Sequence, residues 1–127
     1  MKNIYINRLN QIYQSLTKNS YDGFYVTNLT NIRYLTGFTG SAGVLIILNN
    51  QSYFLTDGRY IQQSKEQVKN SKITIINSSY FQTIKDEKIL NSENLNMAFE
   101  SNHISFSYYS KLSKFFSKIN WVSTDSI

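Results

Sequence analysis

Two short loops carry the side chains of this chain that are best suited to chemistry. One of them is Asp57-Gly58-Arg59-Tyr60, and an aspartate directly before a helix can accept backbone N–H bonds. Arginine offers five donors in a planar fork that fits a carboxylate. We therefore expect Asp57 and Gly58 to form a turn that caps a helix. Arg59 either pairs with a local acid or holds an external carboxylate, and Tyr60 either packs in the core or joins that contact.

The other loop is rich in glycine and spans residues 37–43. Its small residues form a predicted turn: Gly37, Gly40, Ser41 and Gly43. This spacing does not match the G-x-G-x-x-G of dinucleotide sites, and no Lys-Ser or Lys-Thr pair follows as in a P-loop. A strand is predicted after the loop, where an anion site needs the N-terminus of a helix. We therefore expect no nucleotide site, and glycines that serve a positive φ or a close backbone approach.

Ser41 does not have the setting of a nucleophile. Thr39 stands where the G-x-S-x-G motif needs a serine-flanking glycine, so that motif is broken. The motif also requires a helix directly after the serine, where a strand is predicted here. We expect the hydroxyl of Ser41 to bond to the backbone of its own turn.

Metal-binding residues are few. The chain has no cysteine and one histidine, His103. Glu100 and His103 have the Glu-x-x-His spacing of helical di-iron sites, but that geometry needs a helix and a second copy of the motif. A strand is expected to end at this point, and the other acidic residues are scattered along the chain. We therefore expect no metal ligand and no catalytic residue in this chain, and His103 in a surface or half-buried loop.

The hydrophobic pattern predicts an α/β domain that holds these loops. Helices are expected over residues 4–18, 58–69, 80–90 and 105–118, with a short helical turn that begins at Asn28 or Thr30 and ends at Tyr34. Asn19 is the predicted C-terminal cap of the first helix. Strands are expected over residues 23–27, 44–48, 52–56, 73–76, 95–99 and 121–123. This order predicts a single three-layer domain with a mixed, mostly parallel sheet, one antiparallel hairpin and helices on both faces.

Composition bounds the class of protein. A chain of 127 residues with 41% hydrophobic and 15% aromatic residues suits one compact domain. No apolar run is long enough to span a membrane, and residues 1–8 do not form a secretory signal. With no cysteine, a cytoplasmic location is expected. The net charge of +5 is spread along the chain, so we expect a solvated basic surface and no nucleic acid, including at the stripe Lys111, Lys114 and Lys118.

Three stretches resemble the N-terminal domain of the creatinase, prolidase and aminopeptidase P family. Residues 31–43 (NIRYLTGFTGSAG) resemble its first signature and residues 54–63 (FLTDGRYIQQ) its second. Residues 99–105 (FESNHIS) are a weaker third match, and the three keep the family's order over nearly the whole chain. Within the family, the sequence is most similar to bacterial Xaa-Pro aminopeptidases. Leu29-Thr30 departs from the proline and acid that relatives often place there, which alters a turn and not a site.

The resemblance implies a function for the whole family that this chain does not perform alone. Family members cleave the bond before proline with two divalent ions (manganese, cobalt or zinc), held by two Asp, one His and two Glu of a C-terminal catalytic domain. That domain is absent from residues 1–127. The resemblance therefore implies a non-catalytic domain that supplies oligomer contacts and one wall of the substrate entrance. Its residues near the peptide would be Phe38, Arg59 and Tyr60.

The implied partners are the chain's own C-terminal catalytic domain, a second or further copy in a homo-oligomer, and the peptide substrate. Two alternatives remain open at this point. One is a self-standing binding module for RNA or an acidic partner that reuses the fold. The other is a truncated paralogue that assembles with a full-length peptidase.

Overall fold

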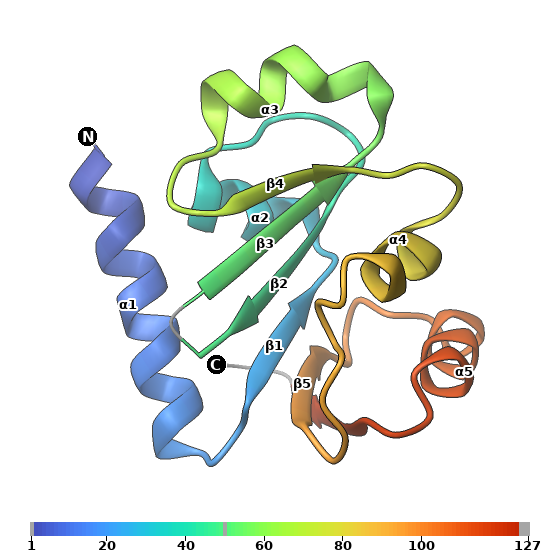
Figure 1. Cartoon of the computed structure of the whole chain (residues 1–127). Coiled ribbons are helices and arrows are strands. Elements are labelled where there is room, and N and C mark those ends of the chain that lie inside the picture. The colour runs from blue at the N-terminus through green and yellow to red at the C-terminus, as the bar shows by residue number, and fades with distance from the viewer. Residues whose placement is uncertain (1, 50, 125–127) are drawn as a thin grey trace.

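One mixed sheet positions both loops (Figure 1). The computed structural model describes residues 2–49 and 51–124. Within them, six strands are ordered β4-β3-β2-β1-β5-β6. The strands are β1 Gly23–Val26, β2 Val44–Leu48, β3 Gln51–Thr56, β4 Lys72–Ile75, β5 Asn96–Glu100 and β6 Asn120–Thr124. β2 is antiparallel to both β1 and β3, and the remaining neighbours pair in parallel, so β2 runs against the other five.

The predicted fold class is confirmed by this topology. β2 and β3 form the expected hairpin, with Val44 opposite Leu55 and Leu48 opposite Gln51. The pairing of β2 with β1 adds a second antiparallel contact that the residue pattern did not specify. Since β1, β3, β4, β5 and β6 share one direction, their carboxyl ends lie at one edge of the sheet, together with the start of β2.

Helices cover both faces of the sheet and complete three layers. α1 Lys2–Lys18, α2 Leu29–Thr36 and α3 Ile61–Gln67 cover one face, and α4 Tyr80–Asp86 and α5 Phe106–Phe115 cover the other. In Figure 1, α1 lies to the left of the strands and α4 and α5 lie to the right. Each face has its own apolar core, so the central strands β1, β2, β3 and β5 are buried on two sides, while the edge strands β4 and β6 are only partly buried.

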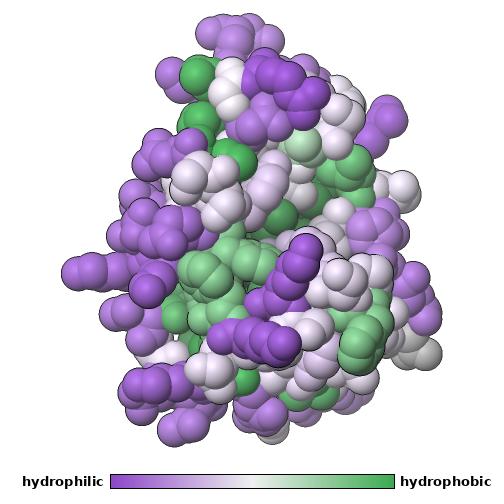
Figure 2. Space-filling model, turned by 90° about the vertical axis from the view of Figure 1, so that its right-hand side faces the viewer, coloured by the Kyte–Doolittle hydropathy of each residue, from purple (hydrophilic) through white to green (hydrophobic). Residues whose placement is uncertain are grey.

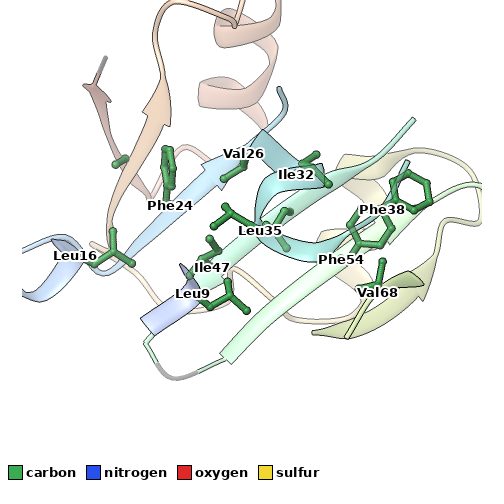
Figure 3. Close-up of a cluster of buried hydrophobic side chains, with 12 residues drawn as sticks. Leu9, Leu16, Phe24, Val26, Ile32, Leu35, Phe38, Ile47, Phe54 and Val68 are labelled. Carbon is green, nitrogen blue, oxygen red and sulfur yellow. The ribbon is translucent and has the colours of Figure 1, made fainter. Parts of the chain in front are cut away.

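Strand alternation divides the side chains between the two cores. In β1, Phe24 and Val26 enter the cluster drawn in Figure 3, together with Leu16 of α1 and Leu35 of α2. Tyr25 points the opposite way and joins the cluster under α4 and α5. This period of two is what a strand buried on both faces requires.

Three helices end earlier than predicted. The segment 58–69 is a 3₁₀ turn, Gly58–Tyr60, followed by α3, which ends at Gln67 because Val68 turns extended and enters the core. α4 ends at Asp86 and α5 at Phe115. After α4, the chain turns through a left-handed Lys88.

Helix termini follow the predicted chemistry with one correction. Asn28 is the N-cap of α2, and its side chain accepts a bond from the N–H of Thr30. After α1, the left-handed residue is Ser20, with φ 59°, and not Asn19. The Asn19 side chain instead donates to the carbonyl of Ser15 at 2.8 Å. Asn19 therefore closes the helix through its side chain while its neighbour makes the turn.

Candidate functional site

The hairpin brings the two loops side by side. The first loop ends where β2 begins and the second begins where β3 ends, and Val44 and Leu55 are paired in the ladder. The hydroxyl of Thr56, the last residue of β3, donates to the carbonyl of Ala42 at 2.6 Å and holds the first loop beside the start of the second. We call this region, residues 37–43 and 57–60, the loop corner.

The glycines of the loop corner have different reasons to be glycine. Gly37 has φ 89° and donates its N–H to the carbonyl of Arg33, so it ends α2 in a left-handed cap. A Cβ on Gly40 would lie 2.3 Å from the ring of Phe38 and 2.8 Å from the ring of Tyr60. Gly43 packs against the ring of Phe54. Gly58 has open space around it, so neither a positive φ nor a close contact requires glycine at this position.

Phe38 lies beneath the loop corner and not on its surface. Its side chain is 1% exposed, and its ring centre is 4.6 Å from that of Phe54. Tyr60 packs edge-on against it, with ring centres 5.4 Å apart. Phe38 therefore supports Tyr60 from below, and its burial excludes a direct contact with a peptide in this arrangement.

Asp57 and Arg59 form a bidentate ion pair at the rim of the loop corner. The guanidinium donates through Nε to Oδ1 at 3.0 Å and through Nη2 to Oδ2 at 2.8 Å. Asp57 also caps the 3₁₀ turn by accepting the N–H of Arg59. The hydrogen bond from the Arg59 side chain lowers the pKa of Asp57, and the same bond raises the pKa of Arg59. Arg59 thus has a local acid, and its side chain is still 67% exposed.

Tyr60 connects the two loops through its hydroxyl. That oxygen lies 2.6 Å from Oγ of Ser41, and the Ser41 backbone N–H donates to it at 3.1 Å. These bonds lower the pKa of the Tyr60 phenol, because they favour its ionised form. The Arg59 guanidinium also lies over the Tyr60 ring, 5.1 Å from its centre. Ser41 therefore bonds to a neighbouring side chain and not, as predicted, to its own turn.

Hydrogen bonds between Thr39 and two glutamines, which were not among the predicted site residues, hold the loop corner to α3. The N–H of Thr39 donates to Oε1 of Gln67 at 2.9 Å, and Nε2 of Gln67 donates back to the Thr39 hydroxyl at 2.9 Å. Gln63 donates to the same hydroxyl at 3.1 Å. The sequence carries one signal of this contact: Gln63 and Gln67 are four residues apart, so a helix places their carboxamides on one face, where both can reach the same partner.

Glu100 and His103 lie at the opposite half of the same end of the sheet, and both bond to Thr27. Glu100 is 8% exposed and accepts bonds from the N–H groups of Thr27 and Asn28, at 2.7 and 2.9 Å, and from the Asn31 side chain. Nδ1 of His103 lies 2.8 Å from the Thr27 hydroxyl. His103 is exposed in its loop. Across residues 2–49 and 51–124, no group of three or more His, Cys, Asp or Glu side chains could hold a metal ion.

The predicted basic stripe, which runs from α5 into the segment after it, is an exposed surface. Lys111 and Lys114 are exposed, and Lys118 pairs with Glu93 at 2.9 Å. Figure 2 shows the side of the molecule that carries α4 and α5, where hydrophilic side chains alternate with small apolar areas. Among the helices of the described ranges, none is long and apolar enough to cross a bilayer.

Comparisons with known proteins match nearly the whole length of this chain. Residues 8–127 match the family model of the creatinase/prolidase N-terminal domain. A Xaa-Pro aminopeptidase structure from Streptococcus pyogenes superposes with a TM-score of 0.86 at 26% identity, over 98% of this chain and 94% of that one. The N-terminal, creatinase/prolidase-like domain of a protein from Corynebacterium diphtheriae gives 0.82 at 31% identity, over 97% and 98% of the two chains.

A curated relative is much longer than this chain. The uncharacterized peptidase YqhT of Bacillus subtilis (strain 168) is 39% identical over 92 residues, which are 72% of this chain and 26% of that protein. The chain therefore spans about a quarter of that relative's length.

Proposed function

This chain belongs to the creatinase/prolidase N-terminal domain family, and we propose that it is the non-catalytic N-terminal part of a Xaa-Pro aminopeptidase. One observation carries the proposal. The family match runs over residues 8–127, while the chain corresponds to only 26% of a related peptidase. Most of such a relative lies outside the region that this chain matches, and that remainder is where the proposal assigns the hydrolysis. A cytoplasmic location is part of the proposal and rests on the absence of cysteine.

The described residues do not offer a site for the metal ions that the family resemblance implies. A pair of divalent ions needs several carboxylate or imidazole ligands that converge on one point. No such convergence exists among the described residues. Glu100, which comes three positions before the single histidine, directs its carboxylate to backbone N–H groups instead. The proposal accordingly assigns manganese, cobalt or zinc to the C-terminal domain and no reaction step to this one.

We assign the loop corner to one wall of the substrate entrance. Arg59 is the residue suited to contact the peptide, because it is exposed and its ion pair fixes it in place. The fork to Asp57 uses Nε and Nη2, and Nη1 takes no part in it. Tyr60 supports that position through its ring, and Phe38 supports Tyr60 from the core. The proposed partners are the C-terminal catalytic domain, a second copy of the protein and the peptide substrate.

An assay of the purified chain tests the absence of catalysis. The chain is incubated with Mn²⁺ or Co²⁺ and a peptide that begins Xaa-Pro, and the released amino acid is measured. We expect no release above a metal-only blank. Release that co-elutes with the chain in size exclusion and disappears with EDTA would overturn the proposal. Activity in other fractions would come from a contaminating peptidase. In that case, only the activity of the fractions that contain the chain is counted.

A further inference from the structure

A polar pocket lies away from the loop corner, at the carboxyl ends of β1, β5 and β6. Its volume is about 420 Å³. Its floor is apolar and continuous with the core of Figure 3, where Phe24 and Leu35 are drawn, and α1 contributes Ile12. Its rim is polar: Asn28, Asn31, Glu100, Asn102, His103 and Thr124. Small-ligand sites have this size and this mixture, and in α/β sheets they occur at the carboxyl ends of strands.

Glu100 places a buried carboxylate in the wall of this pocket. Its three hydrogen-bond donors are two backbone N–H groups and a carboxamide, all of them neutral. Within the described ranges, the ion pairs are Arg59 with Asp57 and Lys118 with Glu93, so no cationic side chain pairs with Glu100. A carboxylate has about four acceptor positions, and three are in use here. A buried charge that is balanced only by dipoles gains from a cation placed beside it.

One basic residue, Arg8, contacts a residue of the pocket wall. Nη1 of Arg8 donates to the carbonyl of Tyr34 at 2.7 Å, and the guanidinium lies over the Tyr34 ring at 4.0 Å. Tyr34 lines the pocket and Arg8 does not. Arg8 therefore holds one wall in place without neutralising Glu100.

We propose that this pocket binds a cationic group, a primary ammonium or a guanidinium on a short apolar stem. The charged head pairs with Glu100 and bonds to carboxamide oxygens of the rim, such as that of Asn102, while the stem lies on Phe24 and Leu35. The cation belongs either to a free amine or to a lysine or arginine side chain of a partner protein. This inference does not rest on the proposed peptidase function, since none of its residues lies in the loop corner.

Titration of the ¹⁵N-labelled chain by NMR tests the inference with four probes of equal stem. Butylammonium and butylguanidinium should shift the amides of Thr27, Asn28 and Asn31 saturably, and butanol and pentanoate should not. Acetylated, amidated tripeptides with a central lysine or arginine separate the two sources of the cation. If only the peptides bind, the cation comes from a partner protein, and if the small amines bind equally well, a free amine suffices. Equal binding of butanol, or no saturable shift with any cationic probe, would overturn the inference.

Three variants give the measurement its controls. Glu100→Gln keeps an oxygen for the two N–H groups and removes the charge, so the affinity for the cations should fall about tenfold or more. Glu93→Gln removes an exposed charge far from the pocket and should leave the affinity unchanged. Asn102→Asp adds a charge to the rim and should strengthen binding severalfold, which no loss of folding can imitate. If Glu100→Gln does not fold, the test rests on Asn102→Asp. An unchanged affinity for the cations in that variant would refute the proposal that the pocket binds a cationic group.

Discussion

The hydroxyl of Tyr60 lies 2.6 Å from that of Ser41, and this contact joins a loop that precedes β2 to a turn that follows β3. Tyr60 also lies between Phe38 in the core and Arg59 at the surface. The position of the exposed guanidinium is therefore coupled to the packing of a buried ring. A substitution at Phe38 or Tyr60 should therefore change the position of the Arg59 side chain.

Tyr60→Phe separates the hydrogen bond from the packing. The phenylalanine ring keeps its contact with Phe38, while Ser41 loses the partner of both its hydroxyl and its N–H. We expect a lower melting temperature and faster hydrogen exchange at the Ser41 amide, with the global fold unchanged. Ser41→Ala is the matched variant, because it removes the same side-chain bond from the other side. If neither variant changes exchange in residues 37–43, the bond does not hold the two loops together.

Gly40→Ala tests the close approach in the loop corner. A Cβ at this position meets the Phe38 ring at 2.3 Å and the Tyr60 ring at 2.8 Å, so both rings must move. Overpacking of this kind costs about 1–3 kcal/mol in the free energy of unfolding. Urea denaturation at neutral pH measures the loss.

Gly58→Ala is the control for that experiment. Its Cβ would meet nothing within 4 Å, and its backbone is helical in the 3₁₀ turn. Because alanine restricts the unfolded chain more than glycine does, we expect a change between zero and a gain of about 1 kcal/mol. Equal losses in both variants would mean that the crowding around Gly40 is not the cause.

Acid should weaken the loop corner through Asp57. The pKa of Asp57 is lowered from 3.8 in the folded state, so its contribution to stability is complete above the unfolded value and is lost as the pH falls through the folded one. Asp57→Asn should therefore reduce stability at pH 7, and the difference from the wild type should shrink as the pH falls below 3.8 toward the lowered pKa of Asp57. Urea midpoints over this range measure the difference. A difference that stays constant even under conditions acidic enough to protonate Asp57 in the folded protein would show that the carboxylate charge is not responsible.

Glu100 should matter for stability more than an exposed carboxylate. Glu100→Ala leaves the N–H groups of Thr27 and Asn28 without their acceptor, which costs about 1–3 kcal/mol for a buried donor. Glu100→Gln keeps one oxygen for them and should lose less. Chemical denaturation of the two variants measures the order. If the alanine variant is as stable as the glutamine variant, the carboxylate does not anchor the start of α2.

The elements and the sheet class could be predicted, because they depend on patterns within short windows. Alternation in β1 and β2 and the apolar stripe of α1 carry that information locally, as does the preference of Asp57 for a helix cap. The placement of Phe38 could not be predicted this way. An aromatic residue between glycines suggests a surface contact, and its burial depends on Phe54 and Tyr60, which follow later in the chain.

The pocket around Glu100 could not be predicted from the sequence either. The donors to its carboxylate come from residues about seventy positions earlier, and they are mostly backbone groups that carry no sequence signal. The order of the strands has the same origin, because β1 pairs with β5 although β2, β3 and β4 lie between them in the sequence. Long-range pairings of this kind are set by the whole fold.

Arg59→Ala in a full-length protein that carries this chain tests the entrance role. If the guanidinium contacts the peptide beyond the scissile bond, KM for longer Xaa-Pro peptides should rise about three- to tenfold while kcat changes little, because uniform binding is lost. Dipeptides that do not reach Arg59 should be unaffected. Arg59→Lys keeps the charge without the fork and should lie between the two. The basic surface of α5 supplies the matched control, since Lys114→Ala removes an exposed charge at a distance and should leave KM unchanged. Equal KM values for Arg59→Ala and the wild type on every peptide would place Arg59 outside the substrate path.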